Sequence, residues 1–305
     1  MFGGATASGT TASSGGYQVV FSGGRASGTV VDAGGFELVS GGTASGTILS
    51  AVGYEIVYSG GHASGTVVSN GGQELVESGG VASGTTVANG GLQYVLVGGQ
   101  ASGTILSNGG QEHVLSGGSA SDTTVLFNGL QYVQAGTALG TIVSNGGYQF
   151  VYSGGQASGT IVSSGGQEHV SSGASASDAT LVGGTLEIHS GGTAGTSLIT
   201  ISSGTLVLDD SQNFSGSIAG LANSSQVVDL VDINFSAGMT VAFSGTSAGG
   251  TLTVQNSSQS AQLTLIGNYL AATFTSAGDG HGGTLITDPP VSSGSGVASP
   301  SQRSD

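Results

Sequence analysis

The sequence predicts an all-β fold: a right-handed parallel β-solenoid with coils of about 19 residues, followed by a smaller β-rich module. One observation behind this is an internal repeat marked by the tetrad Ala-Ser-Gly-Thr or a variant of it. The other is a composition with 61 glycines, 3 prolines and no cysteine among 305 residues. Collagen and disordered linkers need more proline or a strict three-residue glycine period. The glycines therefore mark the corners of a regular structure, and the right hand follows the general preference of parallel crossovers.

The repeat is regular in length. Its tetrads begin at Ala7, Ala26, Ala44, Ala63, Ala82, Ala101, Ala120, Ala138, Ala157 and Ala176, in steps of 18 or 19 residues. Each unit contains two short β-branched runs separated by glycine-rich corners, which predicts two short strands in each coil. One unit cannot bury its own apolar face, so the units must stack with each strand paired to its equivalent in the next coil.

Stacking turns each position of the repeat into a column, and two columns are predicted to face the core. The first is an unbroken valine column, which comprises Val20, Val39, Val57, Val76, Val95, Val114, Val133, Val151 and Val170. The second follows the tetrad threonines and includes Ile48, Val67, Ile105, Ile142 and Ile161, with Thr86 and Thr124 as exceptions.

A third column holds only acids and their amides: Gln18, Glu37, Glu55, Glu74, Gln93, Glu112, Gln131, Gln149 and Glu168. Strict alternation places it on the same face as the valines, but a neighbouring glycine corner can interrupt alternation, so its facing stays open. The column is either a polar strip for a ligand or a hydrogen-bond ladder. The ladder is favoured because the glutamines relieve the repulsion of stacked carboxylates. For the equally regular tetrad threonines, a solvated or hydrogen-bonded ladder is favoured over an ice-binding array.

The charge balance excludes several partners. The chain has 2 Lys and Arg against 17 Asp and Glu, for a net charge of −15. Without a basic patch, binding to nucleic acid or to an anionic membrane surface is not expected. No apolar run approaches the roughly 20 residues of a membrane helix, so no membrane insertion of this chain is expected. The absence of cysteine excludes disulfides and thiolate metal sites.

No catalytic, cofactor or metal site is predicted. The five histidines show no paired ligand spacing, and His113 and His169 lie three coils apart in a column that elsewhere holds Tyr94, Tyr132 or Phe150. The repeats lack the aspartates of calcium-binding β-rolls.

Four aspartates of the second region, Asp209, Asp210, Asp229 and Asp232, form either an ion site or, as favoured, a solvated acidic patch. A polysaccharide-active β-helix enzyme would need acids clustered at a short separation. Glu37, Glu55 and Glu74 could approach that separation. These three are ordinary members of the repeat, and the chain has no lysine.

At the level of motifs, the repeats resemble a known family. GGQELVESGGVASGTTV from Gly71, NGGQEHVLSGGSASDTTV from Asn108 and GGYQFVYSGGQASGTIV from Gly146 look like the passenger repeats of AIDA-type autotransporter adhesins, the group that includes antigen 43. The resemblance covers about residues 3 to 196. It implies a non-enzymatic β-helical passenger at the outer surface of a Gram-negative cell, which mediates aggregation, biofilm formation or attachment.

The resemblance also implies partners and modifications. The partners would be further copies of the chain, on the same or on neighbouring cells, or host and matrix glycans. Several family members carry heptose on repeat serines, and the corresponding tetrad serines here are Ser27, Ser45, Ser64, Ser83, Ser102 and Ser158. Alternatively, the solenoid is a passive stalk or matrix segment of a larger secreted protein, with no binding of its own.

The predicted organisation has three parts. The solenoid occupies residues 3–196, a β-rich module that continues or caps it occupies 197–290, and a Ser-, Gly- and Pro-rich disordered tail occupies 291–305. The family's signal peptide and C-terminal barrel do not occur in this sequence, and the second region is similar to modules of large secreted repeat proteins. Type I secretion is therefore an alternative export route, and the abrupt start of the repeat suggests a fragment.

Overall fold

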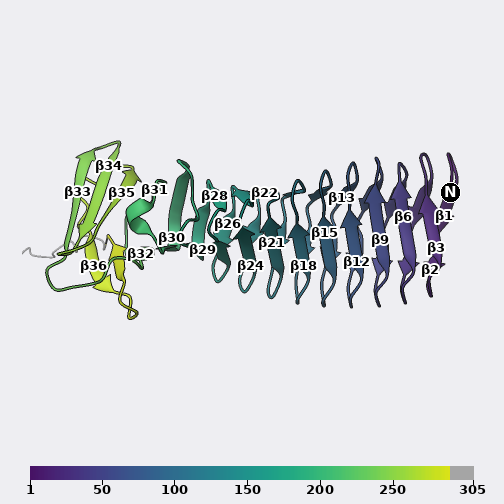
Figure 1. Ribbon diagram of the computed structural model, residues 1–305, viewed down its shortest axis with the longest axis horizontal. Helices are drawn as coiled ribbons and strands as arrows, with labels where there is room; N and C mark the ends of the chain where they lie inside the picture. The colour runs from purple at the N-terminus through teal and green to yellow at the C-terminus, as the bar shows by residue number, and fades with distance from the viewer. Residues whose placement is uncertain (289–305) are drawn as a thin grey trace, which may run out of the picture.

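The computed structural model describes residues 1–288, and these form a long rod of stacked β-strands (Figure 1). The rod begins at the N-terminus, and the last strands of the chain form a broader module at its other end (Figure 1). Each strand of a coil pairs in parallel with its equivalent in the next coil, so that Ala26 lies beside Ala44 and Val39 beside Val57. The predicted parallel β-solenoid is therefore confirmed. The predicted tail at 291–305 lies outside the described residues.

Each coil contains three strands, one more than the sequence predicted. The first strand carries the tetrad and forms a 10-stranded sheet of β1 (Thr6–Ser8), β4 (Arg25–Ser27), β7 (Thr43–Ser45), β10 (His62–Ser64), β13 (Val81–Ser83), β16 (Gln100–Ser102), β19 (Ser119–Ser121), β22 (Thr137–Leu139), β25 (Gln156–Ser158) and β28 (Ser175–Ser177). The tetrad thus belongs to a strand of its own, and its alanine points inward: Ala44 and Ala82 are fully buried.

The second strand is the shortest. Its copies are β2 (Thr11–Ala12), β5 (Val30–Val31), β8 (Ile48–Leu49), β11 (Val67–Val68), β14 (Thr86–Val87), β17 (Ile105–Leu106), β20 (Thr124–Val125), β23 (Ile142–Val143) and β26 (Ile161–Ser163). It is separated from the third strand by an Asn-Gly or related corner. Asn70, Asn89 and Asn108 have φ values of +48°, +51° and +49° there, a region that asparagine and glycine tolerate.

The third strand is the longest of the coil. Its copies are β3 (Tyr17–Val20), β6 (Phe36–Ser40), β9 (Tyr54–Tyr58), β12 (Gln73–Val76), β15 (Leu92–Val95), β18 (Gln111–Val114), β21 (Leu130–Gln134), β24 (Tyr148–Tyr152) and β27 (Gln167–Val170). Its side chains alternate between inside and outside. All nine valines of the predicted first column are fully buried, so that column is confirmed as core.

The second predicted core column is wrong by one residue. Ile48, Val67 and Ile105 point outward and are 44%, 42% and 39% exposed, and Ile142 and Ile161 also face solvent. The tetrad threonine before each of them is buried, so alternation turns the next side chain outward and the following one inward. The core column is instead Val31, Leu49, Val68, Val87, Leu106, Val125, Val143 and Val162, all fully buried.

The regular coil changes after β28. In β29 (Thr180–Ile188) the second and third strands merge into one, with register shifts around Gly183 and Gly184 where the corner had been. β30 (Leu198–Leu208) pairs with it in parallel, and β31 (Ser217–Ala219) and β32 (Gln226–Leu230) pair in parallel with β30. Parallel stacking therefore continues past residue 196.

The last strands are mostly antiparallel. β33 (Thr240–Thr246), β34 (Gly249–Gln255) and β35 (Ser260–Ile266) form successive hairpins, and β35 also pairs in parallel with β31. β36 (Thr275–Gly278) pairs with β37 (Thr284–Thr287), which runs antiparallel along β32. A short 3-10 helix, η1 (Ser211–Asn213), lies between β30 and β31. These strands cover the edge of the last coil, which would otherwise leave backbone groups unpaired.

Candidate functional site

The acid and amide column lies inside the rod. Eight of its nine side chains are fully buried and Gln18 is nearly so, on the same face as the valines. The tetrad threonines from Thr29 onward are buried beside them. These acids, amides and threonines form a polar seam in the interior, flanked by aliphatic columns. The acid and amide column faces inward because side chains simply alternate along the third strand.

Hydrogen bonds connect this seam within and between coils. The Thr66 hydroxyl donates to Glu55 across 2.8 Å, and the Thr104 hydroxyl donates to Gln93 across 2.9 Å. Between coils, the Gln131 amide donates to Glu112 across 2.7 Å, and the Gln149 amide donates to Gln131 across 2.8 Å. Threonine and glutamine thus supply donors to carboxyl and amide oxygens that water cannot reach.

Burial raises the pKa of the interior acids, because water no longer solvates their charged form. The pKa of Glu74 is raised to about 7 and that of Glu168 to about 8. For Glu55, between the carboxyls of Glu37 and Glu74, burial and then the charge of these neighbours raise the pKa well above its ordinary value. Both carboxyl oxygens of Glu168 lack a hydrogen-bond partner within residues 1–288. The interior therefore favours protonated carboxyls.

The position of this seam changes two functional expectations. A polar strip for a ligand in solvent would need an exposed column, whereas Glu37, Glu55 and Glu74 are completely inaccessible. The same three acids were the carboxyls that a polysaccharide-active enzyme could have used, and they cannot reach a polymer outside the rod. Rods also cannot pack side by side through the Glu, Gln and Thr columns, because these point inward.

A different surface is available for contacts between molecules. The outward side chains of the third strands form an outer aromatic face, defined by Tyr17, Phe36, Tyr54, Ile56, Leu75, Tyr94, His113, Tyr132 and Phe150. These side chains are half-buried except for Tyr17, which is 65% exposed. The face follows the third strands along the length of the regular coils.

Rings on this face stack along the rod. The Tyr17 and Phe36 ring centroids are 4.8 Å apart with planes at 8°, and those of His113 and Tyr132 are 4.8 Å apart with planes at 22°. Such distances match the spacing of neighbouring strands, so register sets the stacking. Burial in the stack lowers the pKa of His113, which favours the neutral form of its imidazole. The sequence placed His113 and Tyr132 in one column but did not predict the apolar face. Tyr17 and Phe36 belong to a second outward column, two residues earlier in the strand.

The tetrad serines lie on the outer side of the first strands. Ser27 is exposed, whereas Ser45, Ser64, Ser83, Ser102 and Ser158 are half-buried. The hydroxyl of Ser45 donates to the Ala26 carbonyl of the preceding coil across 3.3 Å, and Ser83 donates in the same way to Ala63 across 3.3 Å. These hydroxyls form a row along the outer side of the first strands.

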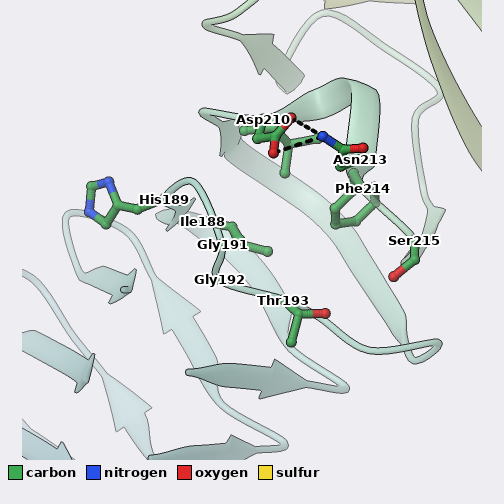
Figure 2. Close-up of a pocket in the computed structure, with 10 residues that line it drawn as sticks. Ile188, His189, Gly191, Gly192, Thr193, Asp210, Asn213, Phe214 and Ser215 are labelled. Carbon is green, nitrogen blue, oxygen red and sulfur yellow. Dashed lines mark hydrogen bonds between the residues drawn. The ribbon is translucent and has the colours of Figure 1, made fainter. Parts of the chain in front are cut away.

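A cavity of about 140 Å³ lies where β29 and β30 end. It is lined by Ile188, His189, Gly191, Gly192, Thr193, Leu208, Asp210, Asn213, Phe214 and Ser215. Figure 2 shows the Asp210 carboxylate accepting two hydrogen bonds from the Asn213 amide, and the His189 ring pointing away from this pair. With its carboxylate already satisfied and its imidazole turned away, the cavity has no convergent reactive groups.

Three of the four aspartates of the second region have different hydrogen-bond partners. Asp210 pairs with Asn213, while Asp232 accepts hydrogen bonds from the backbone and hydroxyl of Ser211. Asp209 contacts His189 instead. His189 lies one coil beyond His169, and their ring centroids are 5.9 Å apart, a proximity that the histidine spacing in the sequence did not indicate.

In the part of the chain that the structure describes, no helix is both long and apolar enough to cross a membrane.

Comparison with known proteins gives two matches. The family model described as "Adhesin of bacterial autotransporter system, probable stalk" matches residues 36–91 and 90–147. The chain is also similar to a solved structure, the crystal structure of a TibC-catalyzed hyper-glycosylated TibA55-350 fragment. The sequence identity is 36% and the TM-score is 0.59, and the match covers 70% of this chain and 85% of that one. No curated protein matches the chain.

Proposed function

Since the chain belongs to the family of AIDA-type autotransporter adhesins, we propose that it is a cell-surface adhesive rod that associates with further copies of itself through the outer aromatic face. One observation carries this proposal: apolar side chains continue from coil to coil on the outside of the third strands. Contiguous exposed apolar surface on a soluble protein marks an interaction site. Association of such rods on neighbouring cells would produce aggregation and biofilm formation.

The stacking of the rings favours self-association over the binding of host or matrix glycans. Successive rings cover one another, as for Phe36 and Tyr54 at 5.2 Å and 11°, so their edges point to solvent. A sugar that packs on an aromatic side chain needs access to the flat side of the aromatic ring. A second apolar β-sheet surface can instead pack against ring edges and aliphatic side chains alike. The partner best suited to this surface is another copy of the same repeat.

The test adds charge to this face. Purified protein with Tyr94→Glu and Tyr132→Glu is compared with the wild type by light scattering over time, after circular dichroism confirms that the variant folds. The matched control carries Thr86→Glu and Thr124→Glu, which place the same charges in the same two coils, on the outer side of the second strands. We expect association to be lost in the tyrosine variant only. Equal association of all three proteins would refute the proposal.

A second function, the passive stalk, is favoured by one observation, because the matching family model carries the description "probable stalk". A stalk needs length and rigidity but no self-complementary face. The same scattering experiment separates the two, since a stalk stays monomeric at every concentration tested. Display on cells, followed by measurement of their settling, extends the distinction to the intact surface.

We also propose that the tetrad serines Ser27, Ser45, Ser64, Ser83, Ser102 and Ser158 accept O-linked sugars. The TibA fragment similar to this chain is described as hyper-glycosylated, and the serines here form one row on the outer side of the first strands. Co-production with a bacterial glycosyltransferase, followed by glycopeptide mapping, tests this. Sugars on the tetrad serines are expected, and sugars confined to corner serines such as Ser59 and Ser78 would contradict it.

A further inference from the structure

Two imidazoles and two carboxylates meet where the regular coils end. His169 belongs to β27 and Glu187 to β29, while His189 and Asp209 directly follow β29 and β30. The Nδ1 atom of His169 is 2.8 Å from an oxygen of Glu187. The Nδ1 atom of His189 is 3.6 Å from the other oxygen of Glu187 and 2.8 Å from an oxygen of Asp209. Glu187 thus lies between the two rings.

The hydrogen bonding of His169 leaves its Nδ1 atom facing an electron-pair donor. Its other ring nitrogen, Nε2, is 3.2 Å from the side-chain oxygen of Gln167, a contact in which the tautomer protonated at Nε2 acts as the donor. In that neutral tautomer Nδ1 has a lone pair, and this lone pair points at a carboxylate oxygen. Only an electron-pair acceptor between the two atoms makes that contact favourable, and the acceptor is either a proton or a metal ion.

The surroundings carry an excess of negative charge. Burial, and then the carboxylates of Asp279, Asp209 and Glu187, raise the pKa of Asp229 to about 6, with a nearby imidazole opposing the shift. Within residues 1–288 the only lysine or arginine is Arg25, at the start of β4 in the second coil. No lysine or arginine of the described residues therefore neutralises this cluster.

We propose that His169, Glu187 and His189 bind a divalent transition-metal ion of the zinc class, with Asp209 supplying a further oxygen beside His189. The three ligand atoms lie within 4.8 Å of one another. The parallel pairing of β27 with β29 fixes the backbones of His169 and Glu187, and the N–H of His189 donates to the Val170 carbonyl across 2.9 Å. Imidazole and carboxylate together suit Zn²⁺, Ni²⁺ or Cu²⁺ better than Ca²⁺ or Mg²⁺. The coordination sphere would keep a position open toward solvent, because the side chains lie on the surface.

One rearrangement is required on binding. The two imidazole planes are at 11°, stacked across neighbouring coils, and a metal must lie in the plane of each ring that ligates it. Each ring therefore turns about its Cβ–Cγ bond. The side chains of His169 and His189 are 21% and 38% exposed, which leaves room for this rotation without a change of the backbone.

The test measures the affinity of the full chain for Zn²⁺ by competition with a chromophoric chelator. We expect one ion per chain and at least a tenfold weaker affinity after His169→Ala, His189→Ala or Glu187→Gln. The matched control is His113→Ala, which removes an imidazole of the same outer column that has no carboxylate beside it. Unchanged affinity in the first three variants, or a loss of the same size in the control, would overturn the proposal.

A second measurement does not depend on the variants folding. Nitrogen-15 NMR of the wild-type imidazoles is recorded during the Zn²⁺ titration. The ring resonances of His169 and His189 are expected to move together until one equivalent is added, while those of His62 and His113 stay in place. If only a proton, and no metal ion, bridges the imidazoles and Glu187, then no imidazole resonance will move when Zn²⁺ is added at constant pH. Because the readout is metal binding, its failure leaves the proposed self-association untouched.

Discussion

The side-chain amide of Gln93 donates a hydrogen bond to the Glu74 carboxyl across 2.6 Å in the interior of the rod, although 19 residues separate the two along the chain. This contact shows why amides are interspersed among the acids. A glutamine has an N–H group to give to a buried carboxyl of the neighbouring coil, and an ionised glutamate has none. Where three acids follow one another, at Glu37, Glu55 and Glu74, one carboxyl can donate to the next only when it is protonated.

The first prediction concerns the pH dependence of stability. Burial raises the pKa of Glu168 from 4.5 to about 8 and that of Glu74 from 4.5 to about 7, so the folded chain keeps protons that the unfolded chain releases. The free energy of unfolding is therefore highest below pH 4.5 and falls as the pH rises toward 8. Urea unfolding at pH 4.5, 6 and 8 checks this. A stability that rises over this range would show that the carboxyls are ionised inside the rod.

The second prediction is that Glu168→Gln stabilises the protein at pH 7. A glutamine carries no ionisation penalty, and the preceding coil already holds Gln149 at this position. The pKa change of Glu168 corresponds to a gain of roughly 3 kcal/mol at pH 7 and almost none at pH 4. Urea unfolding of Glu77→Gln, on the outer side, provides the control. A gain of equal size at both pH values would exclude the ionisation explanation.

The third prediction compares two glycines. A Cβ atom on Gly110 would lie 2.0 Å from the Val87 carbonyl oxygen of the preceding coil, so Gly110→Ala must push the coils apart and is expected to cost about 3 kcal/mol. Gly84 has a φ of +62° and open space around it. Asp122 and Asp178 occupy the same position of the tetrad with φ values of 55°.

Gly84→Asp is therefore the matched control, with an expected cost of about 1 kcal/mol or less. Thermal unfolding of both variants measures the difference. Similar losses in the two variants would mean that backbone conformation, and not the close approach of neighbouring coils, explains the glycine at position 110.

The fourth prediction concerns salt. The chain carries a net charge of −15, so copies repel one another while the outer aromatic face attracts. Screening shortens the reach of this repulsion to about 10 Å at 0.1 M salt and about 3 Å at 1 M. Light scattering should therefore show faster association of the wild type as the NaCl concentration rises. Association that weakens with added salt would indicate attraction between charges in place of apolar contact.

Much of the fold was predictable because a repeat maps directly onto stacking. Strand register follows from aligning the tetrads, and the paired residues Ala63 and Ala82 are equivalent in the sequence. The valine column was predictable for the same reason. The candidate site was less predictable from the sequence. The outer aromatic face can be identified only when it is known which side of the third strand is buried. The contact between His169 and His189 joins different positions of neighbouring coils.

The coil length, the parallel pairing, the valine core and the glycine corners follow from the amino-acid sequence, because each depends only on the period of the repeat. That Glu37 points inward and Ile48 outward emerges only in the folded chain, since facing depends on where each corner turns the chain, and a shift of one residue reverses it. The meeting of His169, Glu187 and His189 was likewise decided there. It occurs where the repeat becomes irregular, and no period predicts which side chains become neighbours.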